Sequence, residues 1–215
     1  MKSAGARDRE AVRPRPPLDR RTILTEAVRL VDEQGLAALN MRELADRLQA
    51  GTMSLYHHVP GREALLDGIV EQVLGEIELP PRSLRGWRRR VALMARSFHD
   101  VSLRHPNCVP LLVTRPFASD VALRPCESAF EVLAQAGFAP ERALVVFRAV
   151  VSYVLGFVMM EAAGFLGGLS GDSDPSELAA RGLPYLAEIA PLLAERDLPA
   201  DFEAGLRIIL DGARP

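Results

Sequence analysis

Apolar residues recur at three- and four-residue intervals along most of this chain, and that spacing predicts helices rather than strands. The first such run occupies residues 19–34. Asp19 suits the N-cap of this helix, and Gly35 suits its C-terminal stop. The apolar face of the helix is expected to consist of Ile23, Leu24, Ala27, Val28, Leu30 and Val31.

Three shorter helical patterns follow in the first third of the chain. Asn40, with Glu43 three residues later, has the pattern of a capping box and predicts a second helix. Residues 50–51 form the expected turn before a third helix, for which Thr52 is the expected cap. A fourth helix is expected over residues 62–77.

The Pro80-Pro81 dipeptide marks the predicted domain boundary, because proline disrupts helices. Residues 18–79 then form a small head, and residues 80–215 form a larger body. Residues 1–17 contain four arginines and three prolines with almost nothing to bury, which predicts a flexible basic arm. A plain tail and an arm that contacts the minor groove or phosphates are equally open.

Helical spacing continues through the body without the alternation typical of strands. Further helices are expected at residues 84–104, 106–114, 119–135 and 140–164, from residue 174 onward, and at 201–212, with a loop over 167–174. The sequence therefore predicts an all-α fold.

The second and third helices are too short to enclose a core of their own, so one of them must face outward. This geometry suits a helix-turn-helix in the DNA major groove, where the start of the second of its helices reads base edges. Thr52 and Ser54 offer hydroxyl groups there, and Met53 suits contact with a thymine methyl. Tyr56 and His57 can reach base edges or phosphate oxygens.

Three more side chains complete the candidate DNA interface. His58 and Arg62 suit phosphates, beside the N–H groups that open the fourth helix, and Arg42 can reach guanine or phosphate. The alternative is that the Tyr-His-His run is plain surface. A metal site is disfavoured, because neighbours on a helix point about 100° apart and no carboxylate or thiol converges on them. We expect no metal and no cofactor.

Charge is divided unevenly along the chain, whose net charge is −2. Residues 1–65 carry 11 Lys/Arg against 9 Asp/Glu, whereas residues 97–215 carry 9 against 15. A basic head on an acidic body fits a module that faces phosphates.

Cysteine usage and hydropathy indicate the compartment. Cys108 and Cys126 lack the spacing of a zinc site and favour a reducing, cytoplasmic location. The N-terminus lacks the apolar core of a signal peptide. The most apolar run, residues 149–160, is shorter than the ~20 residues that span a bilayer, so we expect a buried helix and no membrane anchor.

Residues 24–66 resemble the DNA-binding head of the tetracycline-repressor (TetR) family of transcriptional regulators. The matching runs cover residues 27–35, 41–45, 54–59 and 62–67. The resemblance implies a homodimeric repressor on a palindromic double-stranded DNA operator. It also implies base contacts at Arg42, Thr52, Met53, Ser54, Tyr56 and His57, and phosphate contacts at His58 and Arg62.

Thr114-Arg115-Pro116 and residues 201–206 resemble the regulatory domain of the same family. The resemblance implies an internal small-molecule pocket and dimerisation through residues 142–164 and 201–212. Apolar side chains in these two segments can form the dimer contact or pack within one subunit; they are Val145, Val146, Val150, Tyr153, Val154, Phe157, Ile208 and Ile209.

The sequence of the body differs in one respect from that of tetracycline repressors. Those repressors bind drug together with magnesium, through a histidine just before Thr-Arg-Pro. Leu111 or Leu112 stands at that position, and Glu78 or a neighbour replaces a second histidine that contacts drug. Leucine cannot ligate a hard cation, so we expect a small, largely hydrophobic effector other than magnesium-tetracycline.

The pocket candidates are side chains on the helices that enclose the cavity in relatives. Methionine and phenylalanine suit an adaptable apolar pocket, with histidine and asparagine as polar selectors. The alternative is that these residues are ordinary core. The candidates are Met94, Phe98, His99, Asn107, Phe117, Phe147, Met159 and Met160.

A basic run opens the body, at Arg82, Arg85, Arg88, Arg89, Arg90 and Arg96. It either lies close to DNA or, as we prefer, forms a solvated helix face that partners acidic residues. Two rival functions remain. A small helical enzyme is disfavoured, because the chain lacks a Ser/His/Asp arrangement, a motif of paired carboxylates and a phosphate-cradling glycine loop. The other rival is a ligand-binding protein whose head no longer binds DNA. We expect a repressor, and an activator remains an alternative, because the sign of regulation depends on the position of the operator and not on the chain.

Overall fold

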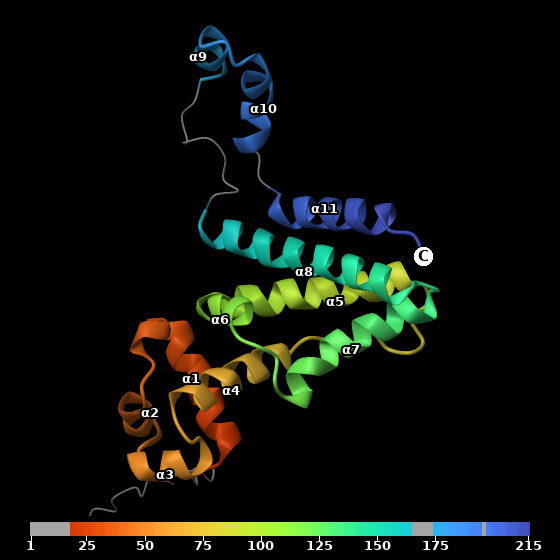
Figure 1. Ribbon diagram of the computed structural model, residues 1–215. Coiled ribbons are helices and arrows are strands. Elements are labelled where there is room, and N and C mark those ends of the chain that lie inside the picture. Colours follow the sequence, from red (N-terminus) through yellow and green to blue (C-terminus); the bar gives the residue numbers. More distant parts are fainter. Residues whose placement is uncertain (1–17, 165–173, 195–196) are drawn as a thin grey trace, which may run out of the picture.

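The computed structural model describes residues 18–164, 174–194 and 197–215, and every regular element within these ranges is a helix. The expected all-α fold is confirmed. Four α-helices and a 3-10 turn form the head at one end of the molecule (Figure 1). They are α1 (Arg20–Gln34), η1 (Leu36–Ala38), α2 (Met41–Leu48), α3 (Thr52–His58) and α4 (Arg62–Leu74).

The body contains the remaining helices. They are α5 (Trp87–Arg104), η2 (Pro106–Cys108), α6 (Val109–Thr114), α7 (Asp120–Gln135), α8 (Pro140–Ala162), α9 (Pro175–Ala180), α10 (Pro184–Ala194) and α11 (Leu198–Gly212). The arm expected over residues 1–17 and most of the loop expected over 167–174 lie outside the described residues.

Side-chain caps define the starts of several helices. The Asp19 carboxylate accepts a hydrogen bond from the Thr22 N–H at 2.7 Å, and the Asn40 side chain accepts one from the Glu43 N–H at 2.9 Å. Each cap satisfies a backbone donor that has no partner inside the helix. The predicted starts of the first and second helices are therefore confirmed.

Other boundaries differ from expectation. Thr52 is the first helical residue of α3 and not its cap, because Gly51 occupies the N-cap position without a side-chain bond. The fourth helix ends at Leu74, since Gly75 follows it. The last helix begins before the expected residue 201, because Asp197 caps it.

The region expected to form one helix from residue 174 onward contains two helices, α9 and α10. Asp174 caps α9 through the Ser176 N–H, and α9 ends at Ala180. Gly182, with a φ of +77°, then separates α9 from α10. These two helices pack on each other, at the end of the molecule opposite the head (Figure 1).

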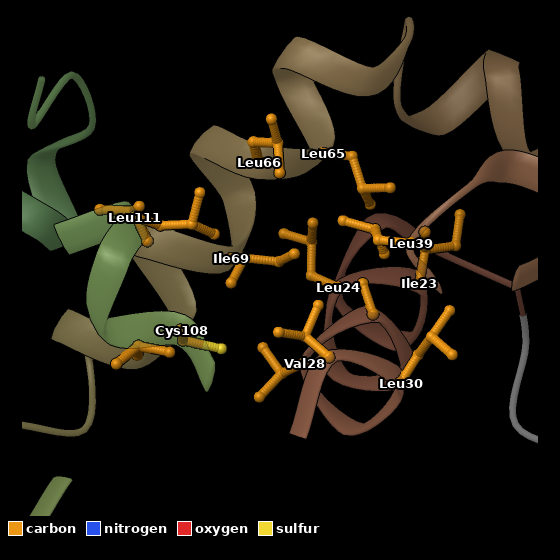
Figure 2. Close-up of a cluster of buried hydrophobic side chains, with 14 of the residues drawn as sticks. Ile23, Leu24, Val28, Leu30, Leu39, Leu65, Leu66, Ile69, Cys108 and Leu111 are labelled. Carbon is orange, nitrogen blue, oxygen red and sulfur yellow. The ribbon is translucent and has the colours of Figure 1, made fainter. Parts of the chain in front are cut away.

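The core of the head is shared with the body. Leu24 of α1 and Ile69 of α4 lie in the same buried cluster as Cys108 and Leu111, which come from η2 and α6 (Figure 2). Gly68 allows α1 and α4 to approach closely, because a Cβ atom on Gly68 would lie 2.3 Å from Leu24 Cδ2. The head is therefore packed directly on the body.

A second core lies inside the body. In Figure 1, α8 lies between α5 and α11, and α7 packs against both α5 and α8. The α8–α11 contact is close at Gly205, where a Cβ atom would lie 2.2 Å from Tyr153 Oη. The Tyr153 hydroxyl donates to the Phe202 carbonyl at 3.0 Å. These contacts hold α11 along α8.

Candidate DNA interface and ligand cavity

Two buried side chains fix α3 to the head. Leu55 of α3 and Val59, the C-cap residue that follows the helix, are both almost completely buried. The chain enters α3 through a tight turn, in which Gln49 adopts a φ of +51° and the Ala50 N–H donates to the Ala45 carbonyl at 2.9 Å. This turn sets the angle between α2 and α3.

The other side of α3 is free of core contacts. Met53 is 71% exposed and Tyr56 is 44% exposed, which are high values for such large side chains. Arg42, in the first turn of α2, is exposed as well. Thr52, Ser54, His57 and His58 are exposed as well, and α2 and α3, which carry all these residues, lie at the outer end of the head (Figure 1).

Arg62 has a structural contact that the sequence did not predict. Its Nη1 donates a hydrogen bond to the Leu39 carbonyl, in the segment just before α2. This bond ties the start of α4 to the start of the helix-turn-helix. Arg62 therefore holds the head together, in addition to the phosphate contact expected of it.

Arg47 fixes α2 against α1, and sequence reasoning missed it. Its guanidinium lies 2.8 Å from Glu33, 3.4 Å from Glu26 and 3.3 Å from Glu43. The hydrogen bond to Glu33 is the main cause that raises the pKa of Arg47 above its ordinary value. The four-residue spacing of Glu43 and Arg47 was the available sequence signal.

The segment after α6 contacts the head through Arg115. Its Nε donates to the Asp67 carboxylate at 2.7 Å, and its Nη2 donates to the Glu63 carboxylate at 3.0 Å. The Arg115 side chain is only 18% exposed, so these ion pairs are partly shielded from water. Both acidic residues lie in the first two turns of α4, immediately after the recognition helix.

A second polar contact joins η2 to the end of α1. Asn107 Nδ2 donates to the carbonyls of Val31 and Asp32 at 3.1 and 3.0 Å. These carbonyls belong to the last turn of α1, and that of Val31 also accepts a hydrogen bond from the Gly35 N–H at 2.7 Å. His105 Nδ1 lies 2.7 Å from the Asp32 carboxylate. Asn107 therefore caps a head helix from the body.

The body encloses an apolar cavity of about 120 Å³ between α4, α5, α6, α7 and α8. Among the described residues that line it, no side chain carries a nitrogen or oxygen atom, and the thiol of Cys126 is the only polar side-chain group. Desolvation by burial raises the pKa of that thiol, which favours its neutral form. The cavity therefore suits an uncharged apolar molecule.

Part of the predicted pocket lines this cavity. Met94, Phe98, Phe117 and Phe147 contribute to its walls. Sequence reasoning missed the small and aliphatic members of the wall, such as Ala122, Ala129 and Leu133. Their helical spacing along α7 was the available signal.

The structure places the other pocket candidates elsewhere. His99 is buried, with its Nε2 3.2 Å from the Glu161 carboxylate and its ring stacked on Phe202. Asn107 faces α1, as described above. Met159 and Met160 are exposed near the end of α8, because they lie on the outer face of that helix. These four residues do not line the cavity.

The positions discussed for magnesium are apolar or exposed. Leu111 and Leu112 are buried, and Leu112 lines the cavity. Glu78 is exposed, and its N–H donates to Ser97 Oγ at 2.7 Å. Over the described residues, no group of three or more His, Cys, Asp and Glu side chains is placed to hold a metal ion.

Four arginines of the basic run lie in the first ten residues of α5, and the other two precede this helix. Arg88 donates to the carbonyls of Leu210 and Ala213 at 3.0 and 3.1 Å, beside the Asp211 carboxylate. Arg96 forms a bidentate ion pair with Glu203. These two arginines hold α5 to α11, in keeping with the preferred interpretation that the run partners acidic residues.

By length and composition, α8 is the one helix in the described part of the chain that has the character of a membrane span. One such helix alone is weak evidence that a chain crosses a membrane. Its inner face is buried in the body core through Val146, Val150 and Val154, whereas only 33% of its most apolar 18-residue window is buried.

An outward-facing helix-turn-helix on a helical body with an apolar cavity defines the class of ligand-responsive DNA-binding regulators. The chain belongs to the tetR family of bacterial regulatory proteins, whose model matches residues 23–69. A model described as "Tetracyclin repressor-like, C-terminal domain" matches residues 79–214. The resemblance found in the sequence is confirmed over both parts of the chain.

Two similar proteins are a transcriptional regulator and a tetracycline repressor. An HTH-type transcriptional regulator of Saccharopolyspora erythraea is 39% identical over 150 residues, which cover 70% of this chain and 64% of that protein. The class A tetracycline repressor from transposon 1721 of Escherichia coli is 31% identical over 201 residues, which cover 89% of this chain and 88% of the repressor.

Solved structures show the same architecture. The TetR family protein ActR of Streptomyces coelicolor, in complex with actinorhodin, has a TM-score of 0.73 and 28% identity, over 92% of this chain and 97% of ActR. TetR from Acinetobacter baumannii has a TM-score of 0.70 and 28% identity, over 91% of this chain and 96% of that chain.

Proposed function

We propose that this protein is a homodimeric transcriptional repressor that leaves a palindromic DNA operator when a small uncharged apolar molecule enters the body cavity. The observation that carries the proposal is the division of α3 into two faces. Leu55 and Val59 are buried, whereas every other side chain of α3 is exposed. A helix held in this way presents its outer face to a major groove.

The exposed side chains have the chemistry that this role needs. Tyr56 and His57 reach base edges or phosphates, and Arg42 offers a guanidinium fork for guanine or phosphate. The proposal assigns phosphate contacts to His58 and Arg62, which are both exposed. In a dimer, two such helices about 34–36 Å apart meet successive major grooves.

Dimerisation is proposed through the outer faces of α8 and α11. Val145 and Ile208 are 55% and 73% exposed there, respectively, and these apolar side chains have no partner within the described part of the subunit. Apolar surface of this kind is typical of a four-helix contact between two subunits. Of the other apolar candidates, Val146, Val150, Val154 and Phe157 are buried within the subunit, and Tyr153 and Ile209 are half-buried.

The effector is proposed from the chemistry of the cavity. ActR was solved with actinorhodin, which supports a body that takes organic ligands. The described lining side chains offer neither a charge nor a carbonyl group, so magnesium-tetracycline is not proposed. An uncharged aromatic or aliphatic molecule gains most from such walls.

Catalysis is not part of the proposal, because the family consists of regulators and the cavity lacks an acid, base or oxygen nucleophile. A ligand-binding protein without DNA binding is the remaining rival. A repressor differs from it in a strong salt dependence of DNA binding.

The test begins with selection of duplexes from a random pool by the wild-type protein. Tyr56→Ala should weaken binding to the selected duplex about 10-fold or more, since a good base contact contributes ~1–3 kcal/mol. Light scattering should show an unchanged dimer. Tyr185→Ala is the matched control, because Tyr185 is an exposed tyrosine on α10. Unchanged affinity in Tyr56→Ala contradicts the assignment.

The effector is tested with N-phenyl-1-naphthylamine, an uncharged dye that fluoresces in apolar surroundings. The dye should bind the wild-type protein and release the duplex. Ala129→Phe fills part of the cavity and should abolish the fluorescence. Dye binding that survives this substitution places the ligand elsewhere.

A further inference from the structure

A groove separate from the apolar cavity lies between α5 and α11 and has a volume of about 200 Å³. Four arginines line it, against two carboxylates. The arginines are Arg88, Arg89, Arg96 and Arg207, and the carboxylates are Glu203 and Asp211. The groove therefore has an excess of two positive charges, on a chain whose net charge is −2. A groove with such an excess attracts anions.

Two of these arginines already bind groups of α11. Arg96 forms the bidentate ion pair with Glu203, and its hydrogen bond is the main cause that lowers the pKa of Glu203. Arg88 donates to the Leu210 carbonyl at 3.0 Å and lies 3.5 Å from the Asp211 carboxylate. These contacts fix the two walls of the groove and neutralise both of its carboxylates.

The other two arginines, Arg89 of α5 and Arg207 of α11, form no ion pair with a residue that the structure describes. Both are exposed, and Arg207 acts on Glu203 only at longer range. A guanidinium offers paired N–H donors that match the oxygens of a carboxylate. An anion held by both side chains therefore gains charge-assisted hydrogen bonds from α5 and from α11.

The rest of the groove lining is apolar. It consists of Ala92 of α5 and of Leu206 and Leu210 of α11. A ligand that covers these side chains gains from the burial of apolar surface, whereas an inorganic anion does not. The combined lining therefore matches a molecule with an anionic group on an apolar body.

We propose that the groove between α5 and α11 is a second ligand site, which binds an organic anion through Arg89 and Arg207. The anionic group is a carboxylate or a sulfonate, and the apolar part of the ligand lies over Leu206. This site goes beyond the proposed function, because the described side chains of the body cavity offer no charge to such a ligand. Ile208, in the proposed dimer contact, does not line the groove, so the two contacts use different faces of α11.

The test uses the full-length protein and 8-anilino-1-naphthalenesulfonate, which is the naphthylamine dye with a sulfonate group added. The sulfonate probe should bind Ala129→Phe, in which the cavity is filled, whereas the uncharged dye should not. Decanoate should displace the probe from this variant and decanol should not, because the site requires an anionic group. Fluorescence titrations measure these three results.

Substitution of the two arginines then locates the probe. In the Ala129→Phe background, Arg89→Gln combined with Arg207→Gln should weaken probe binding about 10-fold or more, because both charge-assisted contacts are lost. Arg21→Gln combined with Arg124→Gln is the matched control, because it removes the same charge from two exposed arginines outside the groove. The control should keep the affinity within twofold. Calorimetry with decanoate in the wild-type background repeats the comparison without the filled cavity.

Either of two results overturns the proposal. In one, the probe does not bind Ala129→Phe and decanoate does not bind the wild-type protein. In the other, Arg89→Gln with Arg207→Gln binds these anions as tightly as the control pair does. Failure of the proposed function looks different, because it concerns duplex binding and its release by the uncharged dye, neither of which this site requires.

Discussion

Gly68 shows how a single position decides the packing of the head. A Cβ atom there would lie 2.3 Å from Cδ2 and 2.8 Å from Cδ1 of Leu24. Leu24 is buried in the shared core, so it has little space into which to move. Relief of the clash therefore requires either a strained conformation of Leu24 in the packed core or a movement of α4 away from α1.

We predict that Gly68→Ala lowers the free energy of unfolding by about 1–3 kcal/mol, although alanine has the higher helix propensity. Urea unfolding measures the change. Gly51→Ala is the matched control, because its Cβ would meet only Ser54 Oγ at 3.7 Å. Equal stability of the two variants contradicts the packing argument.

The orientation of single side chains in the candidate site could not be predicted from the sequence. Phe98 lines the cavity, whereas its neighbour His99 faces Glu161 and Phe202. Helical spacing tells which positions share a face, but not which face meets a cavity. That choice depends on how α5 packs against α7, α8 and α11, which local sequence does not encode.

At the scale of elements, helix starts were predictable because their signals are local. Asp19, Asn40 and Ser119 each cap the helix that follows them. The contacts between helices were not predictable in the same way. Arg20 donates to both carboxylate oxygens of Glu71 at 3.0 Å and so joins α1 to α4, across 51 positions of sequence.

This ion pair makes stability depend on pH. The hydrogen bonds from Arg20 lower the pKa of Glu71 below its ordinary value of 4.5, against the opposite effect of burial. A lowered carboxyl pKa stabilises the fold above pH 4.5, and this contribution is lost as the pH falls through the folded-state pKa. Exposure of Arg20 limits the effect to less than about 1 kcal/mol.

We predict that acidification below about pH 4.5 destabilises the wild-type protein more than Arg20→Gln, which lacks the ion pair. Urea midpoints measured over that pH range test this. Arg21→Gln, which changes an exposed arginine on the same turn, is the control and should follow the wild-type curve. Parallel curves for all three proteins contradict the prediction.

Arg115 lies where the cavity meets the DNA-binding head. Leu112 and Phe117, on either side of it in sequence, line the cavity, while Arg115 itself holds Asp67 and Glu63 of α4. A ligand that displaces this short segment therefore also displaces the start of α4. Asn107, which contacts α1, differs from Arg115 in this respect, because the described residues next to it in sequence do not line the cavity.

We predict that Arg115→Gln binds the selected duplex and the naphthylamine dye but loses most of the dye-induced release. When two sites in a protein are coupled, one ligand typically changes the affinity for the other by about 5–150-fold. In Arg115→Gln, the dye should change the affinity for DNA by less than this. Asn107→Ala should weaken DNA binding by the same factor with and without dye. Gel-shift titrations measure both ratios. Full dye-induced release in Arg115→Gln contradicts this role.

At the scale of the whole molecule, we propose that the outer faces of α8 and α11 form the contact between two subunits. Val145→Glu combined with Ile208→Glu places charges on both faces, and we predict dissociation to monomers and loss of high-affinity DNA binding. Analytical ultracentrifugation measures the first effect. Val113→Glu is the control, because Val113 is similarly exposed on α6. A stable dimer of the double variant contradicts the proposed interface.

The shared core of Cys108, Leu111 and the head helices limits how such regulators can be recombined. A hybrid that joins this head to the body of another relative at Pro80 would bring foreign side chains to the positions of Cys108 and Leu111. Only bodies that match the head in volume there would support a folded hybrid. We therefore expect that operator specificity can be exchanged between relatives when η2 and α6 are transplanted together with the head.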